Sequence, residues 1–153
     1  YILLKPPYLS EKESIEDAVK SAIDAAPHVD KISINPVNVQ KNTVVEKLWF
    51  RNEWTAPWLW SVIEVLRKCE DLPIRVYSDP TGGGTRRGAH NCHDCNKKVL
   101  EALKNHRLGL GNLKGLHCNC KSRWNTLVQQ SKLRRNGSEP HGYRSGFAGS
   151  RHF

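Results

Sequence analysis

The chain has 153 residues, 38% of them hydrophobic, and a formal net charge of +9, which suits one ordinary domain or one small domain with an appendage. No apolar run approaches the roughly 20 residues that a membrane-spanning helix needs. The opening residues, Tyr1 to Pro7, do not form a secretory signal. These features exclude a transmembrane protein, and we expect a cytoplasmic one.

The positive charge lies entirely in the second half of the chain. Residues 1–77 hold 10 Lys and Arg against 11 Asp and Glu, whereas residues 78–153 hold 14 against 4. This asymmetry indicates an anionic partner for the second half, most often a nucleic acid. A solvated basic surface would give the same composition.

Strand and helix patterns alternate through residues 1–77. Ser10 and Glu13 form a capping box ahead of an apolar helical face that Pro27 ends, and Pro57 occupies the first position of a later helix. The alternation predicts parallel strands joined by right-handed crossovers and covered by helices. We expect strands at 1–4, 31–34 and 73–77, and helices at 10–26, 43–50, 57–68 and 96–107.

Composition divides the chain into three parts. Residues 78–133 hold too few aliphatic side chains to close a core alone, so we expect a basic lobe that needs a structural metal to fold. The triglycine at 82–84 lacks the Lys and Ser/Thr of a phosphate-binding loop, so it predicts a flexible connector between residues 1–77 and the basic lobe. Residues 134–153, rich in Arg, Gly, Ser and His, predict a disordered tail.

Two cysteine motifs give the sharpest chemical signal. Cys92-His93-Asp94-Cys95 and Cys118-Asn119-Cys120 are separated by 22 residues, and four thiolates on two tight turns can close a tetrahedral shell around Zn²⁺. His90, His93 and His117 are near enough in sequence to replace one thiolate. We expect a structural zinc site whose ligands are Cys92, Cys95, Cys118 and Cys120.

Other interpretations of the cysteines stay open. An iron–sulfur cluster accepts four thiolates as well, and a redox CxxC would not need the second pair. Disulfides are disfavoured in a reduced cytosol. Cys69, at the end of an apolar helix, is expected to be a small buried hydrophobe.

Polar side chains follow each predicted strand, and ligands of parallel α/β sheets bind at the carboxyl ends of strands. Asp79 follows the third strand. For Lys5, after the first strand, the structural alternative is a lysine whose charged end reaches solvent. For the stretch from Asn35 to Gln40, after the second strand, it is an Asx-turn that satisfies backbone groups. The tryptophans at 49, 54, 58 and 60 are expected to pack rather than to stack on bases. The candidate cofactor-binding residues are Lys5, Asn35, Asn38 and Gln40.

Several segments carry a resemblance to a known family. The stretches Leu4–Glu13, Ile34–Thr43 and Pro57–Val62, followed by the region from Arg87 to Cys120, resemble in that order the archaeal radical SAM protein family of archaeosine biosynthesis. The similarity covers roughly residues 1–132. It matches the stretch after the second strand to a pocket-lining segment, and the four cysteines to the ligands of a C-terminal metal-binding extension.

The resemblance implies a fold and a reaction. It implies an α/β fold in which residues 1–77 form part of a (β/α) TIM-type barrel, followed by a small metal-binding lobe at 78–133 with four cysteine ligands. It also implies S-adenosylmethionine, a four-iron four-sulfur cluster and a tRNA substrate, whose lysine-modified deazaguanine base becomes archaeosine by radical C–N cleavage. A partner enzyme would attach the lysine beforehand.

One feature of that family is absent from these residues. The cluster-binding CxxxCxxC does not occur here, so we expect its ligands upstream of Tyr1 and assign no catalytic residue. The leading hypothesis is the C-terminal part of a radical SAM tRNA-modifying enzyme. The alternatives are a non-catalytic, zinc-stapled RNA-binding module and a thiol redox protein.

Overall fold

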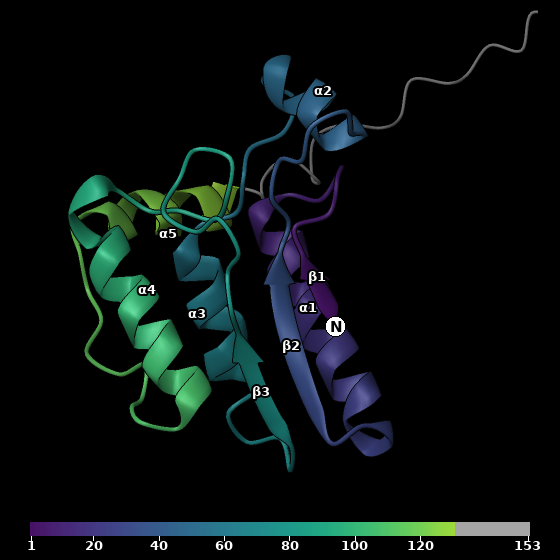
Figure 1. Ribbon diagram of the computed structural model, residues 1–153, viewed down its shortest axis with the longest axis vertical. Coiled ribbons are helices and arrows are strands. Elements are labelled where there is room, and N and C mark those ends of the chain that lie inside the picture. The colour runs from purple at the N-terminus through teal and green to yellow at the C-terminus, as the bar shows by residue number, and fades with distance from the viewer. Residues whose placement is uncertain (131–153) are drawn as a thin grey trace, which may run out of the picture.

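A computed structural model describes residues 1–130, and the predicted tail at 134–153 lies outside the described residues. The strands are β1 (Ile2–Leu4), β2 (Lys31–Pro36) and β3 (Arg75–Ser78). The helices are α1 (Glu11–Ala25), the 3₁₀ turn η1 (Ala26–His28), α2 (Val44–Phe50), α3 (Leu59–Lys68), α4 (His93–Leu108) and α5 (Cys120–Gln130). Figure 1 shows their arrangement.

The sheet is open, parallel and ordered β1-β2-β3. Ile2 lies opposite Ile34 across the first pair, and Ile32 lies opposite Val76 across the second. The predicted parallel sheet is therefore confirmed. Because side chains alternate along a strand, these residues point to the helical layer, whereas Leu3 lies on the other face and is 56% exposed.

The expectation of a partial (β/α) TIM-type barrel with a separate small lobe is wrong. The three strands of the described residues form an open sheet, and α4 and α5 join the core that α1 and α3 make with it. Val99, Leu103 and Trp124 are buried in that core together with Leu4 and Ile34. The second half of the chain has few aliphatic side chains, so it buries them against the sheet and its helices instead of closing a core alone.

Most predicted elements are confirmed, and the main differences concern α3, α4 and α5. The capping box of α1 is present, with Ser10 and Glu13 bonded to each other's backbone. Pro57 lies outside α3, because Trp58 keeps an extended backbone as the N-cap. Helix α4 begins at His93, earlier than expected, because Cys92 is its N-cap. Helix α5 was not predicted.

A second, smaller core holds α2 at the carboxyl end of the strands (Figure 1). Val39, Leu48, Trp54 and Ala56 are buried in it. The loop at residues 79–92, between β3 and α4, is called the glycine loop below. Arg87 joins this loop to the small core, because its guanidinium pairs with Glu46 and its Nε donates to the Val39 carbonyl at 3.1 Å. The backbone N–H of Asn42 and the Arg87 guanidinium lower the pKa of Glu46.

The segment expected to be a flexible connector is a hydrogen-bonded loop. The Gly84 N–H donates to the Ala89 carbonyl at 2.8 Å, and the Asn96 amide donates to the Gly84 carbonyl at 3.4 Å. A Cβ on Gly88 would lie 2.2 Å from the Gly82 oxygen, so the two backbone segments approach too closely for any side chain there. This close approach fixes the entry into α4.

None of the helices in residues 1–130 is long and apolar enough to cross a membrane.

Candidate metal centre

The structure brings the four predicted ligands together. The Sγ atoms of Cys92, Cys95, Cys118 and Cys120 all lie within 4.8 Å of one another. The Sγ of Cys92 is 3.6 Å from that of Cys95 and 3.5 Å from that of Cys118. The Sγ atoms of Cys95 and Cys120 are 3.6 Å apart.

This geometry fits a single tetrahedral ion. Sulfurs about 2.3 Å from a central Zn²⁺ are about 3.8 Å from one another, close to the distances observed. A multi-iron cluster places several metal ions between its thiolates and would need them further apart. The donor set and its spacing therefore suit Zn²⁺ or another single ion that prefers four thiolates.

The thiols lie where two helices begin, and N–H groups at helix starts favour thiolates. Cys92 is the N-cap of α4, and Cys120 opens α5. Burial opposes ionisation of Cys92, but the Cys95 backbone N–H and the thiols of Cys118 and Cys95 outweigh it and lower the pKa of Cys92 to about 7. Burial and the Cys120 thiol raise the pKa of Cys95. One thiolate forms readily, and a dication would stabilise the others.

Two tryptophans that sequence reasoning assigned no metal role support the cluster. Trp60 is buried and donates from Nε1 to the Sγ of Cys120 at 3.3 Å. Trp124, buried on α5, donates from Nε1 to the Ser61 hydroxyl at 2.8 Å. The Trp60 contact is of the kind that orients a metal ligand, whereas the Trp124 contact holds α5 against α3. The sequence patterns had singled out Trp60 only as a packing residue and Trp124 not at all.

The histidines do not take part in the cluster. The side chain of His93 is fully exposed on α4, and His117 is exposed as well. His90 hydrogen-bonds through Nδ1 to the Gly88 carbonyl at 2.9 Å. The four thiols are thus the donor group that the described residues assemble.

Lys5, the first candidate cofactor residue, is buried in a polar network on the helical side of the sheet. Its Nζ lies 2.5 Å from a Glu11 carboxylate oxygen and donates to the Thr55 hydroxyl at 3.1 Å. Glu11 also accepts from the Ser61 hydroxyl at 2.6 Å and from the Trp58 N–H at 2.8 Å. Since Ser61 accepts from the Trp124 indole, this network runs from β1 to α5.

The backbone of Lys5 is left-handed, with a φ of 62°. Such a conformation costs about 1–3 kcal/mol and persists only where surrounding contacts over-determine it. The buried ion pair with Glu11 supplies those contacts. A cofactor contact of Lys5 stays a prediction.

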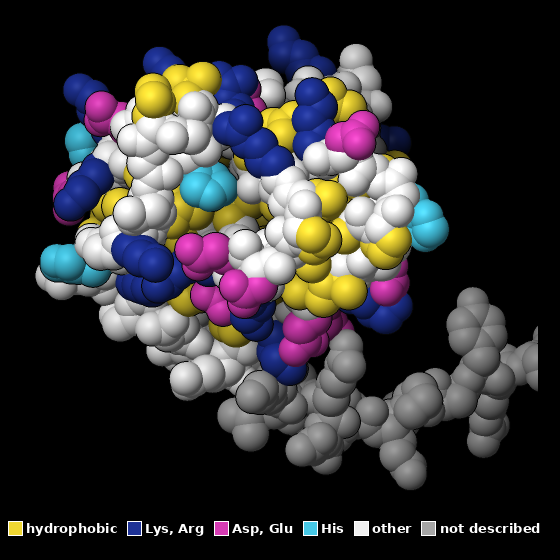
Figure 2. All heavy atoms as spheres, turned by 90° about the horizontal axis from the view of Figure 1, so that it is seen from below, with side chains coloured by type: hydrophobic (Ala, Val, Ile, Leu, Met, Phe, Trp, Pro, Cys, Tyr) yellow, Lys and Arg dark blue, Asp and Glu magenta, His cyan; other side chains and the backbone are white. Residues whose placement is uncertain are grey.

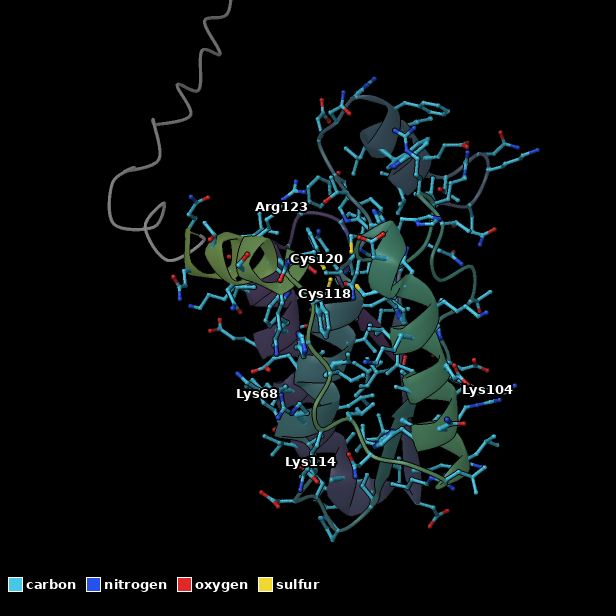
Figure 3. All side chains as sticks on the ribbon, turned by 90° about the vertical axis from the view of Figure 1, so that its left-hand side faces the viewer. Lys68, Lys104, Lys114, Cys118, Cys120 and Arg123 are labelled. Carbon is cyan, nitrogen blue, oxygen red and sulfur yellow. The ribbon has the colours of Figure 1, made fainter. Side chains whose placement is uncertain are left out.

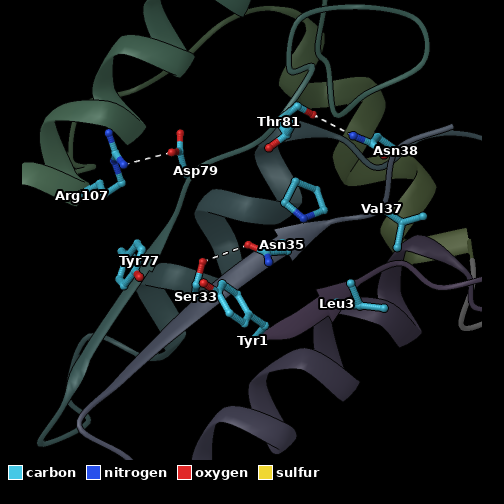
Figure 4. A pocket seen from close by; sticks show the side chains of 11 residues that line it. Tyr1, Leu3, Ser33, Asn35, Val37, Asn38, Tyr77, Asp79, Thr81 and Arg107 are labelled. Atoms are coloured by element: carbon cyan, nitrogen blue, oxygen red, sulfur yellow. Dashed lines mark hydrogen bonds and ion pairs between the residues drawn. The ribbon is translucent and has the colours of Figure 1, made fainter. Parts of the chain in front are cut away.

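Two other candidates, Asn35 and Asn38, share a cavity of about 560 Å³ on the open face of the sheet (Figure 4). Asn35 accepts from the Ser33 hydroxyl at 2.9 Å, and Asn38 donates to the Thr81 carbonyl at 3.3 Å. Gln40 does not line the cavity, although its amide donates to Asn38 at 2.6 Å. The other lining residues are Tyr1, Leu3, Pro36, Val37, Tyr77, Asp79 and Arg107.

We expect the Lys5→Met variant to be destabilised by about 3–5 kcal/mol, because it leaves the Glu11 carboxylate buried without its counter-charge. Lys20→Met, which removes an exposed pair with Asp24, should cost less than about 1 kcal/mol. Chemical denaturation measures both. Wild-type stability of Lys5→Met would show that the pair does not hold the fold.

We expect the protein to bind one Zn²⁺ per chain and to lose it when any one of the four clustered cysteines is changed to serine. Cys69→Ala should keep the metal, because Cys69 is buried elsewhere and lies outside the cluster. Native mass spectrometry measures the metal content. Rapid alkylation of Cys92 and Cys95 in the zinc-loaded protein would contradict ligation, because bound thiolates react slowly.

Comparison with known proteins finds relatives that match most of the chain. The chain is 43% identical over 135 residues to archaeosine synthase subunit beta of Methanosarcina acetivorans, and this match covers 84% of this chain and 38% of that protein. The protein of the same name from Thermococcus kodakarensis is 41% identical over 138 residues, 87% of this chain and 43% of its own length. An uncharacterised protein of Methanocaldococcus jannaschii is 35% identical over 135 residues, 84% of this chain and 37% of that protein.

No family model and no solved structure matches the chain. The chain spans about two fifths of the length of the curated relatives, between 37% and 43%. It is thus homologous, over most of its own length, to one part of proteins named archaeosine synthase subunit beta.

Proposed function

We propose that this chain is part of an archaeosine synthase and takes part in forming archaeosine in tRNA. The observation that carries the proposal is the 43% identity, over 84% of the chain, to a protein named archaeosine synthase subunit beta. The family resemblance of the sequence motifs agrees with it. The word subunit in the relative's name supports a partner chain, and we propose the lysine-transferring enzyme as that partner.

The charge of the second half supports contact with RNA. Residues 78–130 hold 9 Lys and Arg against 3 Asp and Glu. Arg87 and Arg107 are neutralised by Glu46 and Asp79. Across residues 1–130, no acidic group lies within ion-pair distance of the remaining exposed cations of α4, α5 and the glycine loop, which are Arg86, Lys97, Lys98, Lys104 and Arg123.

The opposite end of the molecule has a different character. Figure 2, seen from below, shows Lys and Arg side chains mixed with Asp and Glu side chains. Near the end of α1, for example, Lys20 pairs with Asp24. Uncompensated cations on α4 and α5 suit phosphate contacts, so we assign the RNA-facing role to the second half of the chain.

The metal centre would give those helices a fixed position. We propose Zn²⁺ as the ion, held by the four clustered thiolates at the starts of α4 and α5. Figure 3 shows Arg123 of α5 beside Cys118 and Cys120, with Lys104 further along α4. A structural ion there would set the relative positions of the basic side chains on the two helices.

We also propose the radical chemistry that the family resemblance implies. The reaction would use S-adenosylmethionine and a four-iron four-sulfur cluster, whose CxxxCxxC ligands would come from outside these residues. Asn35 and Asn38 lie in one cavity with Tyr77 and Asp79, so they are our candidates for contacts to cofactor or substrate. Gln40 would support them through Asn38.

Removal of the gene from an archaeal host tests the proposal directly. We expect archaeosine to disappear from digested tRNA, as measured by liquid chromatography and mass spectrometry, and to return with the wild-type gene. The Asn38→Ala gene should restore less archaeosine than the Asn125→Ala gene, whose changed residue is exposed on α5. Unchanged archaeosine after deletion would refute the proposal, whereas full restoration by Asn38→Ala would favour the non-catalytic RNA-binding module.

A salt titration of tRNA binding tests the RNA-facing surface. We expect affinity to fall steeply with salt, and the combined Lys97→Ala, Lys98→Ala and Lys104→Ala variant to have a shallower slope. Each lost phosphate contact should reduce the slope by about 0.7 to 0.9. Lys20→Ala and Lys31→Ala serve as controls in the first half. A slope that these α4 changes leave unaltered would place the RNA elsewhere.

A further inference from the structure

A cavity of about 630 Å³ lies beside the metal centre, and nothing above assigns it a ligand. Three parts of the chain form its walls: α2 with the loop that follows it, the glycine loop, and α5. Its volume lies in the range of roughly 300–1,000 Å³ that small-molecule sites occupy. The lining residues are Trp49, Phe50, Asn52, Trp54, Thr55, Ala56, Trp58, Arg86, His90, Arg123 and Leu127.

The lining combines aromatic rings with cations and contains no carboxylate. Arg86 comes from the glycine loop and Arg123 from α5, and both are exposed. Aromatic faces beside guanidinium groups are the chemistry that binds unstacked bases together with their phosphates. Two guanidinium groups and no carboxylate favour an anionic ligand over a cationic one.

The aromatic rings are held in a defined arrangement. Trp49 and Phe50 meet edge to face with their centroids 5.1 Å apart, and the Arg87 guanidinium lies 5.1 Å from the Trp49 ring centroid. Phe50 is nevertheless 67% exposed. A large aromatic ring that is fixed at its edge and open to solvent is suited to stacking a planar ligand.

Two nitrogen groups are available for hydrogen bonds. Trp54 is only 5% exposed, and its indole N–H has no acceptor among residues 1–130. Buried donors of this kind are nearly always satisfied, so an ordered water beside this shielded N–H is expected. His90 donates from Nδ1 to the Gly88 carbonyl, so its Nε2 is an acceptor in the neutral ring. A 2′-hydroxyl or an exocyclic amino group can donate to it.

The metal centre and this cavity share their framework. His90 lies two residues before Cys92, and Arg123 lies three residues after Cys120. The four thiols therefore connect the glycine loop, which carries Arg86, with α5, which carries Arg123. An ion among the thiols would keep the spacing of these walls constant.

We propose that this cavity binds one unpaired nucleotide of an RNA strand, with its base against the Trp and Phe rings and its phosphates in contact with Arg86 and Arg123. The inference rests on the proposed role in tRNA modification and specifies which feature of the RNA is held. Unpaired nucleotides are the parts of RNA whose bases are free to stack on protein side chains.

Quenching of tryptophan fluorescence tests this proposal, because three of the lining residues are tryptophans. The zinc-loaded full chain is titrated with a single-stranded RNA octamer and with the same octamer annealed to its complement. We expect the single strand to quench the fluorescence and the duplex to quench it far less. Equal quenching by both would overturn the proposal.

The variants locate the binding. Phe50→Ala should weaken binding of the single strand by about five- to a hundredfold, the range for loss of one stacked base, and Phe50→Tyr should restore it. Arg123→Gln, which removes a phosphate contact, should weaken binding and reduce its salt dependence. Tyr8→Ala and Arg67→Ala, which change exposed residues outside the cavity, should bind as the wild type does. Unchanged affinity in both cavity variants would overturn the proposal.

Circular dichroism and zinc content confirm that each variant is folded.

The nucleotide site and the RNA-facing role are refuted by different results. If tRNA binds with a steep salt dependence while the cavity variants and the octamer show no effect, the nucleotide site is refuted and the proposed function stands. If neither tRNA nor the octamer binds, the RNA-facing role itself is refuted.

Discussion

Four cysteine sulfurs that lie within 4.8 Å of one another join the starts of α4 and α5 in the second half of the chain. The Trp60 indole of α3 donates to one of these sulfurs, and the Trp124 indole of α5 donates to Ser61 in the same helix as Trp60. Ser61 in turn donates to Glu11, which pairs with Lys5 at the end of β1. Two adjacent residues of α3 thus make contacts in different directions, Trp60 to the thiol cluster and Ser61 to α5 and, through Glu11 and Lys5, to the end of β1. These contacts help to position the elements that carry the candidate functional residues.

Apolar burial explains why α4 and α5 pack onto the first half of the chain. The apolar residues of the second half, such as Val99, Leu103 and Trp124, are too few to close a core, and they are buried against α1, α3 and the sheet. The polar residues of α4 and α5 remain outside. Figure 1 shows that α4 and α2 begin near the carboxyl end of the strands, so the thiol cluster at the starts of α4 and α5 lies at the same end of the molecule as the small core around α2.

Two cavities lie in this part of the molecule, and their linings suit different roles. The one on the open face of the sheet is lined by amide, phenol and carboxylate groups, including Asn35, Asn38 and Asp79. The one between α2 and α5 is lined by aromatic and cationic groups. An enzyme that modifies a base within tRNA needs both a reacting site and a surface that binds the neighbouring nucleotides. The two cavities provide candidates for these tasks.

The sequence alone determined the local elements and predicted the four thiols that the fold brings together. Apolar periodicity, the Ser10 capping box and the paired cysteine motifs depend on residues close together in the chain, so they identified the strands, most helices and all four thiols. Tertiary structure decided the open sheet, the burial of Lys5 against Glu11, and the support of Cys120 by Trp60. Those features join residues that are distant in sequence, and which distant side chains meet is set by packing of the whole core, a constraint that no local pattern contains.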